Sequence, residues 1–294
     1  MKKSRMKIVA TITDMREAVR GARAEGKVVG LVPTMGALHA GHVALMRRAR
    51  QECGLVVASV FVNPTQFEPK DDLEQYPRDL ESDAAKAESA GVDLIFAPSA
   101  AEMYPPGFDA WVEVGGLTGI LEGASRPGHF RGVTTVVAKL FNIVGPDKAY
   151  FGMKDYQQLK VIGKMVSDLD FPVEIVPVQT VREADGLAMS SRNAYLSVEE
   201  RAAATVLHRA LKLAEERIKS GERDPDRLRE SVTELIRSEP LASVDYVAVV
   251  NPETLEPPVW IDGELLVALA VRVGQTRLID NAIMAAFGQV GVFI

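Results

Sequence analysis

Two histidines three residues apart lie in the stretch Gly36-Ala-Leu-His-Ala-Gly-His42. A β-branched apolar run at 28–32 precedes this stretch, and a helical pattern at 41–51 follows it. At such a strand-to-helix turn, the helix N-terminus offers unpaired N–H groups and the positive end of its dipole. If the helix starts near Gly41, both imidazoles lie at an anion site and can stabilise charge on phosphate oxygens. The alternative is a pair of polar residues on a surface turn.

Two other segments carry groups suited to phosphate. The segment 151–158 follows a short strand-like run and opens a helix. In it, Gly152 permits close approach and Lys154 supplies a point charge, while Asp155 could instead cap the helix. The Met-Ser-Ser-Arg loop at 189–192 can clamp a polyphosphate with two hydroxyls and a guanidinium. Taken alone, the lysine could be a solvated surface residue and the loop a polar linker between domains.

Short apolar runs alternate with helical patterns through the first half of the chain. This alternation predicts βαβ crossovers and a parallel sheet, which is a doubly wound, Rossmann-like α/β fold. A first helix is expected to open at Asp14 with Glu17 and to end near Gly26. Further strands are predicted at 28–32, 55–62, 92–97, 149–151 and 173–178, and further helices at 41–51, 80–90, 134–144 and 156–169.

The pattern changes near residue 180, after which strand-like runs no longer alternate with helices. Ser197 and Glu200 form a capping-box pair that opens a helix to about Ser220, and a second helix follows Pro225. Three strands are predicted at 244–250, 265–272 and 276–280. We therefore predict a Rossmann-like domain at 1–180 and a smaller α+β domain with an antiparallel sheet at 181–294.

Composition limits the classes of function. The 294-residue chain has a net charge of −6, which disfavours a nucleic-acid binder held by phosphate contacts. Its one cysteine, Cys53, excludes an intramolecular disulfide and is interpreted as a structural thiol. No apolar run reaches the ~18 residues of a membrane span, and the basic start at 1–5 is not followed by a signal core. We expect a cytoplasmic protein without nucleic-acid or membrane partners.

The His-x-Gly-His turn and the later Met-Ser-Ser-Arg loop together resemble the nucleotidyltransferase superfamily that includes class I aminoacyl-tRNA synthetases. More narrowly, the sequence resembles the pantoate–β-alanine ligase family. The sequence departs from the family pattern at Met153, where Glu is usual, and at Ala40, where an acidic residue is common, but neither departure removes a group that the chemistry needs. The resemblance rests on five stretches in the expected order, at 33–42, 61–67, 122–133, 151–158 and 181–193.

This resemblance implies an ATP-dependent ligase that joins (R)-pantoate to β-alanine in pantothenate and coenzyme A biosynthesis. A carboxylate is a poor electrophile, so pantoate would first attack the α-phosphorus of ATP, releasing Mg²⁺-pyrophosphate and forming a pantoyl-adenylate. The amine of β-alanine would then displace AMP. The domain at 181–294 would close over the active site, because water hydrolyses the mixed anhydride. The family also implies a homodimer.

The resemblance assigns roles to matching residues. The catalytic candidates, with His42 favoured, are His39, His42, Lys154 and Arg192. These four also belong to the expected ATP site, together with Met35, Gly152, Asp155, Val181, Met189, Ser190 and Ser191. Amides can donate and accept hydrogen bonds together, which suits the two hydroxyls of pantoate. The substrate-binding candidates are Asn63, Gln66, Gln158 and Arg126.

The remaining titratable groups receive simpler interpretations. Mg²⁺ would be held mainly by the ATP phosphates. Asp83 is interpreted as a solvated carboxylate on a helix face, with a place in the Mg²⁺ shell as the alternative. His129 lies in a Gly-rich loop and His208 on an amphipathic helix, so both are interpreted as structural.

Two other functions remain open at the level of sequence. A nucleotidylyltransferase of the same superfamily would keep AMP on its product, but such enzymes are commonly shorter and lack the stretches around Asn63 and Lys154. A non-catalytic RNA-binding relative of the synthetases would need a basic groove, which the acidic composition disfavours.

Overall fold

The computed structural model describes residues 6–67 and 76–286, so the basic start of the chain at 1–5 lies outside the described residues. The chain divides into two compact units. Unit 1 consists of Met1–Gly152 and Gln158–Val178, and unit 2 consists of Met153–Gln157 and Gln179–Ile294. In the part of the chain that the structure describes, no helix is long and apolar enough to cross a membrane.

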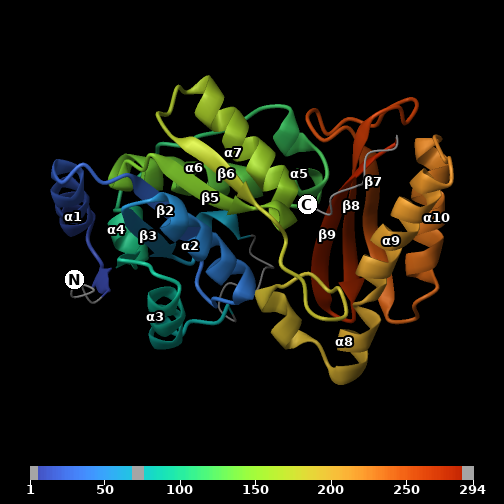
Figure 1. The fold of residues 1–294 in the computed structure, drawn as a ribbon, viewed down its shortest axis with the longest axis horizontal. Helices are drawn as coiled ribbons and strands as arrows, with labels where there is room; N and C mark the ends of the chain where they lie inside the picture. The colour runs from blue at the N-terminus through green and yellow to red at the C-terminus, as the bar shows by residue number, and fades with distance from the viewer. Residues whose placement is uncertain (1–5, 68–75, 287–294) are drawn as a thin grey trace. The chain divides into compact units, whose positions relative to one another are not determined.

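Unit 1 is built on a six-stranded sheet with the order β1-β4-β3-β2-β5-β6, and all of its strand pairs are parallel (Figure 1). The central strands are almost entirely apolar, as expected for strands covered on both faces. The doubly wound α/β fold predicted from the sequence is confirmed. The strands are β1 (Lys7–Val9), β2 (Val29–Thr34), β3 (Leu55–Val60), β4 (Leu94–Phe96), β5 (Lys148–Gly152) and β6 (Glu174–Val178).

The strand order reverses between β2 and β5. Strands β3 and β4 continue from β2 on one side, whereas β5 and β6 lie on the other, with Leu31 of β2 paired to Ala149 of β5. Ligands of open α/β sheets bind beyond the carboxyl ends of the strands at such a point. Because the histidine turn follows β2 directly, the fold places both histidines at this end of a central strand.

Helices of unit 1 pack against the sheet. Leu45 and Met46 of α2 join Val56 of β3 in a buried cluster, while α1 and α6 pack against β2 and against each other. Cys53, which follows α2, is 5% exposed, and burial raises the pKa of its thiol, in keeping with a structural role. The helices are α1 (Ile12–Ala24), α2 (Ala40–Glu52), α3 (Leu80–Ser89), α4 (Ala100–Met103), α5 (Glu122–Ser125), α6 (His129–Val144) and α7 (Tyr156–Asp168, of which unit 1 holds the part from Gln158 on), with short 3₁₀ helices η1 (Pro64–Gln66) and η2 (Leu117–Gly119).

Unit 2 contains a three-stranded antiparallel sheet in the order β7-β8-β9, against which α9 and α10 pack (Figure 1). Leu211 of α9, Val232 of α10 and Val267 of β8 lie in one buried core. The predicted smaller α+β fold is therefore confirmed. The elements are β7 (Ala242–Val250), β8 (Glu264–Val273), β9 (Thr276–Ala285), α8 (Val198–Ala203), α9 (Val206–Lys219), α10 (Pro225–Arg237), η3 (Met153–Asp155) and η4 (Ser191–Tyr195).

Two local predictions are wrong at helix ends. The single helix expected to run to Ser220 is divided between Ala203 and Val206, where backbone bonds span three residues instead of four: Thr205 N donates to Ala202 O at 3.3 Å and Leu207 N to Ala204 O at 3.2 Å. The cap of α1 is Thr11 rather than Asp14: Thr11 Oγ1 accepts from Asp14 N at 3.1 Å. By contrast, both halves of the predicted capping box that opens α8 are present.

Gly132 allows a close approach between α6 and η1 and gives a test of this packing. A β-carbon at Gly132 would lie 2.4 Å from Thr65 O, so Gly132→Ala should destabilise the protein by about 1–3 kcal/mol through overpacking. Gly163 of α7 is the matched control, since its β-carbon would meet nothing within 4 Å. Gly163→Ala should stabilise the protein by about 0.5–1 kcal/mol. Urea denaturation measures both changes, and equal stabilities of the two variants would contradict the packing described here.

Candidate functional site

The turn between β2 and α2 contains two successive residues in the left-handed region, Gly36 (φ 87°) and Ala37 (φ 50°). A side chain on Gly36 would lie 2.9 Å from Asp83 Oδ2, so space as well as conformation requires glycine there. Ala37 N donates to Asp83 Oδ2 at 3.0 Å, and Leu38 N donates to Asp83 Oδ1 at 2.7 Å. Gly36 N donates to Thr34 Oγ1 at 3.2 Å. The carboxylate on α3 thereby fixes the backbone of the turn.

Asp83 is 2% exposed, so its interpretation as a solvated carboxylate on a helix face is wrong. Each of its two oxygens accepts a backbone N–H from the turn, and such bonds to a charged acceptor are strong. Sequence reasoning missed this role because Leu38 is 45 residues away and no local pattern links the two positions. The first turn of α3 carries two carboxylates, Glu81 and Asp83, and nothing in the sequence distinguishes the buried one.

His39 and His42 lie at the N-terminus of α2, as predicted. His39 is the N-cap, and its Nδ1 accepts from Gly41 N at 3.1 Å, while His42 Nδ1 accepts from His39 N at 3.3 Å. A ring nitrogen that accepts carries no hydrogen, so each neutral imidazole carries its hydrogen on Nε2. The ring centroids are 4.1 Å apart. The turn thus provides two neighbouring Nε2–H donors where the helix dipole favours an anion.

Three predicted residues of unit 1 form a connected polar cluster around η1. Asn63 Nδ2 donates to Gln66 Oε1 at 3.0 Å and to Gly132 O at 3.1 Å, and Gln66 Nε2 lies 3.1 Å from Met35 Sδ. Asn63 is only 1% exposed. Its Oδ1 accepts from Tyr104 Oη at 2.9 Å, and burial raises the pKa of Tyr104, so this hydroxyl remains a donor. Tyr104 is a supporting residue that the sequence analysis did not identify.

Arg126 joins the same cluster from the loop before α6. Its Nη2 donates to Gln66 O at 3.4 Å, and His129 Nδ1 lies 2.9 Å from the same carbonyl oxygen. His129 therefore helps to hold the amide segment, which agrees with a structural interpretation. Gln158, the fourth substrate-binding candidate, lies half-buried in the first turn of α7. Gly152 is the last residue of β5.

Unit 2 contains the remaining candidates. Lys154 and Asp155 lie in η3, with Lys154 Nζ 4.0 Å from Asp155 Oδ2 and the lysine side chain 19% exposed. Met189 N donates to Val181 O at 2.9 Å, so both residues form the base of a tight hairpin. Ser190 caps η4 by accepting from Arg192 N at 3.3 Å. The side chains that follow the hairpin are half-buried, namely those of Ser190, Ser191 and Arg192.

His208 of α9 packs against this hairpin. Gly186 adopts φ 91°, and a β-carbon there would lie 2.0 Å from His208 Cδ2. Burial lowers the pKa of His208, and the positive charge of Arg182 lowers it further, so the neutral ring is favoured. These contacts agree with the structural interpretation of His208.

The predicted ATP-binding residues are thus divided between the units. Those up to the end of β5 belong to unit 1, namely Met35, His39, His42 and Gly152. The later ones belong to unit 2, namely Lys154, Asp155, Val181, Met189, Ser190, Ser191 and Arg192. Among the described residues, no group of three or more His, Cys, Asp or Glu side chains could hold a metal ion.

Comparison with known proteins gives one consistent family. A family model described as pantoate-beta-alanine ligase matches residues 7–283. A pantothenate synthetase of Heliobacterium modesticaldum is 58% identical over 279 residues, covering 95% of this chain and 99% of the relative. A pantothenate synthetase of Pelotomaculum thermopropionicum is 57% identical over the same length, with the same coverage of both chains.

Solved structures agree with the sequence relatives. The pantothenate synthetase of Thermus thermophilus superposes with a TM-score of 0.90 at 52% identity, covering 96% of this chain and 100% of that one. A pantoate-beta-alanine ligase of Francisella tularensis, solved with beta-gamma ATP and beta-alanine, gives a TM-score of 0.79 at 35% identity, covering 94% and 97% of the two chains. Family model, relatives and fold agree over nearly the whole chain, which therefore belongs to the pantoate–β-alanine ligase family of ATP-dependent ligases.

Proposed function

We propose that the chain condenses pantoate with β-alanine through a pantoyl-adenylate. The pantoate carboxylate attacks the α-phosphorus of ATP, and the bond to pyrophosphate breaks. The amine of β-alanine then attacks the acyl carbon, AMP leaves with the bridging oxygen, and the nitrogen loses a proton. The paired histidines at the N-terminus of α2 carry this proposal, because two Nε2–H donors at a positive helix end suit charge that develops on phosphate oxygens.

The residues of unit 1 would bind the reacting groups. His39 and His42 would donate to the phosphates of ATP, with His42 as the main catalytic group. The amide cluster would bind pantoate and β-alanine. Because Asn63 is buried and donates to Gln66, its contribution includes orienting the Gln66 amide. The other proposed contacts of unit 1 come from Met35, Gly152, Gln158 and Arg126.

The residues of unit 2 would neutralise the charge of the phosphates. Lys154 and Arg192 supply positive charge, and Ser190 and Ser191 supply hydroxyl donors. Further contacts to ATP are proposed for Asp155, Val181 and Met189. We propose that unit 2 acts as the smaller domain that protects the adenylate from water during the second step.

Mg²⁺ would accompany ATP as a complex with its phosphates, where it neutralises the departing pyrophosphate. Asp83 suits a different task, since both of its oxygens accept backbone N–H groups of the histidine turn. A homodimer stays a prediction from the family resemblance, and light scattering tests it. A cytoplasmic location stays a prediction from the composition of the chain, and cell fractionation tests it. The nucleotidylyltransferase alternative is not favoured, since the ligase family model spans residues 7–283.

An omission assay tests the reaction itself. The protein is incubated with ATP, Mg²⁺, pantoate and β-alanine, and each component is left out in turn while AMP and pantothenate are measured. Both products should form only in the complete mixture, whereas pyrophosphate exchange into ATP should require pantoate but not β-alanine. If folded protein that binds ATP forms no AMP in the complete mixture, the proposed reaction is wrong.

His42→Asn separates catalysis from helix capping. Asparagine can place an oxygen near the position of Nδ1 and so still accept from His39 N, but it has no donor at the position of Nε2. Adenylation should fall about 100- to 1000-fold, as for loss of a donor to a developing negative charge. Melting temperature should stay close to wild type, whereas His42→Ala should also lose about 1 kcal/mol of capping energy. Near-wild-type turnover of His42→Asn would remove His42 from the mechanism.

Asp83→Asn distinguishes support of the turn from Mg²⁺ binding. The new NH₂ group would face one of the two backbone N–H donors at Ala37 and Leu38, so stability should fall by about 2 kcal/mol and adenylation should slow. Raising the Mg²⁺ concentration should not restore the rate. Glu88→Gln, on the exposed face of the same helix, should change neither property. Recovery of the Asp83→Asn rate at high Mg²⁺ would instead identify Asp83 as a metal ligand.

A further inference from the structure

Strand β9 of unit 2 carries two consecutive buried polar residues in an otherwise mainly apolar sequence. Asp280 is 2% exposed and Asn281 is 8% exposed, while Leu278 and Ala282 on either side belong to the apolar core. Buried polar groups are costly unless they are hydrogen-bonded, so a pair of them in a core strand needs a reason. Their contacts supply one.

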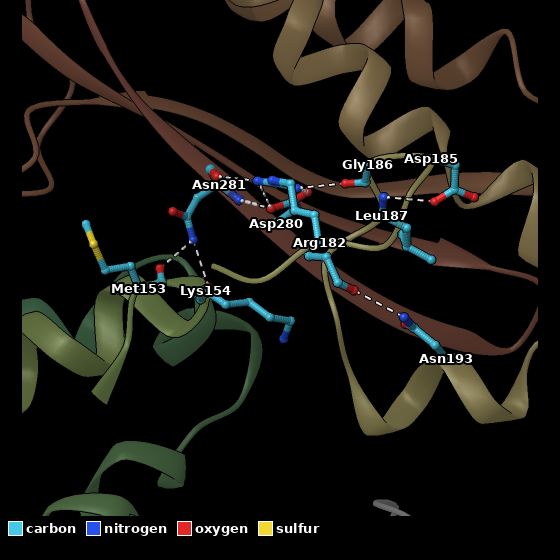
Figure 2. Close-up of polar contacts among 10 residues, drawn as sticks. Met153, Lys154, Arg182, Asp185, Gly186, Leu187, Asn193, Asp280 and Asn281 are labelled. Atoms are coloured by element: carbon cyan, nitrogen blue, oxygen red, sulfur yellow. Dashed lines mark hydrogen bonds and ion pairs between the residues drawn. The ribbon is translucent and has the colours of Figure 1, made fainter. Parts of the chain in front are cut away.

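The carboxamide of Asn281 holds η3 at two adjacent points. Its Nδ2 donates to Met153 O at 3.0 Å and to Lys154 O at 2.7 Å (Figure 2). A three-residue 3₁₀ helix has little internal bonding with which to fix its own orientation. Because one planar amide group donates to two successive carbonyls, it fixes both the position and the rotation of this turn. Lys154, the phosphate-binding candidate, projects from it.

Asp280 fixes the strand from which Asn281 projects. Arg182 donates to the two Asp280 oxygens at 2.7 and 3.0 Å, and the carboxylate itself is almost completely buried. Arg182 also donates to Gly186 O at 3.0 Å and to Asn281 O at 3.3 Å (Figure 2). Such a bidentate pair is rigid as well as strong. Asn281 is thus a fixed point on a braced strand rather than a mobile side chain that happens to contact η3.

We propose that Asn281 is a positioning residue for ATP: by binding the carbonyls of Met153 and Lys154, it holds the Lys154 ammonium where the phosphates bind. This inference rests on the phosphate-binding role proposed for Lys154. Asn281 itself contacts backbone and not substrate. The two-point contact pairs both carbonyls and also fixes the orientation of the turn from which Lys154 projects.

Two substitutions remove the contact in different ways. Asn281→Leu keeps a similar volume without donors, and Asn281→Ser keeps a small polar group that cannot reach both carbonyls. If the leucine variant fails to fold, the serine variant carries the test. Asn251→Ser is the matched control, since Asn251 also binds two backbone groups in unit 2, accepting from Glu253 N at 2.8 Å and Thr254 N at 3.1 Å.

The kinetics of the full reaction are then measured with each substrate varied. Both Asn281 variants should lower kcat/KM for ATP by about 10- to 100-fold, the size of effect expected for a misplaced binding group, while KM for β-alanine stays the same. Asn251→Ser should leave all constants close to wild type. A general loss of stability would instead reduce the amount of active enzyme and leave the KM for ATP unchanged.

A double-mutant cycle with Lys154→Ala decides whether Asn281 acts through Lys154. In the Lys154→Ala background, Asn281→Leu should reduce kcat/KM for ATP less than about twofold, because the group that it positions is already gone. Equal losses in both backgrounds, or near-wild-type kinetics of the Asn281 variants, would overturn the inference. If Lys154→Ala alone is near wild type, the role of Lys154 fails, and the inference with it. Failure of the whole proposed function is separate, because wild-type protein would then form no AMP.

Discussion

The candidate site depends on the hydrogen bonds between the buried carboxylate of Asp83 and the backbone of the histidine turn. Gly36 and Ala37 reverse the chain in a conformation that leaves backbone donors pointing away from helix and sheet. Buried donors of this kind must be paired, and Asp83 pairs two of them. Without that carboxylate, two backbone donors of the turn would lose their partner, and the start of α2 with its two imidazoles would be held less firmly.

The same use of polar atoms recurs in two candidate segments, the histidine turn and the cluster around η1. The Nδ1 atoms of His39 and His42 each accept a backbone N–H of the turn, which fixes the orientation of both imidazoles. Around η1, Tyr104 and Gly132 bind Asn63, which binds Gln66. In each case one polar atom secures the side chain and so limits the entropy that must be lost when a substrate binds. These side chains are therefore held in place by their specific hydrogen-bond partners, which the fold class alone does not supply.

Local signals in the sequence predicted most of the fold and the placement of the paired histidines at a helix N-terminus. Alternating β-branched runs and helical periods indicated the parallel sheet, and the spacing of His39 and His42 placed them at a helix start, where the structure has them. Interactions between distant residues could not be predicted. The burial of Asp83 depends on a turn 45 residues away, and the role of Asn281 depends on η3, 127 residues from it along the chain. The break before α9 was missed because no glycine or proline marks it in the sequence.

The separation between η3 and β9 also bears on synthesis of the protein. The chain leaves the ribosome from its N-terminus, so the sheet of unit 1 can fold while most of unit 2 is still untranslated. Lys154 emerges with β5, but the Asn281 amide that binds its carbonyl follows 127 residues later. A nascent chain therefore has the histidine turn long before the lysine is anchored. Premature termination after β5 and before β9 yields a polypeptide that retains the first half of the candidate ATP site and lacks the anchor of the second.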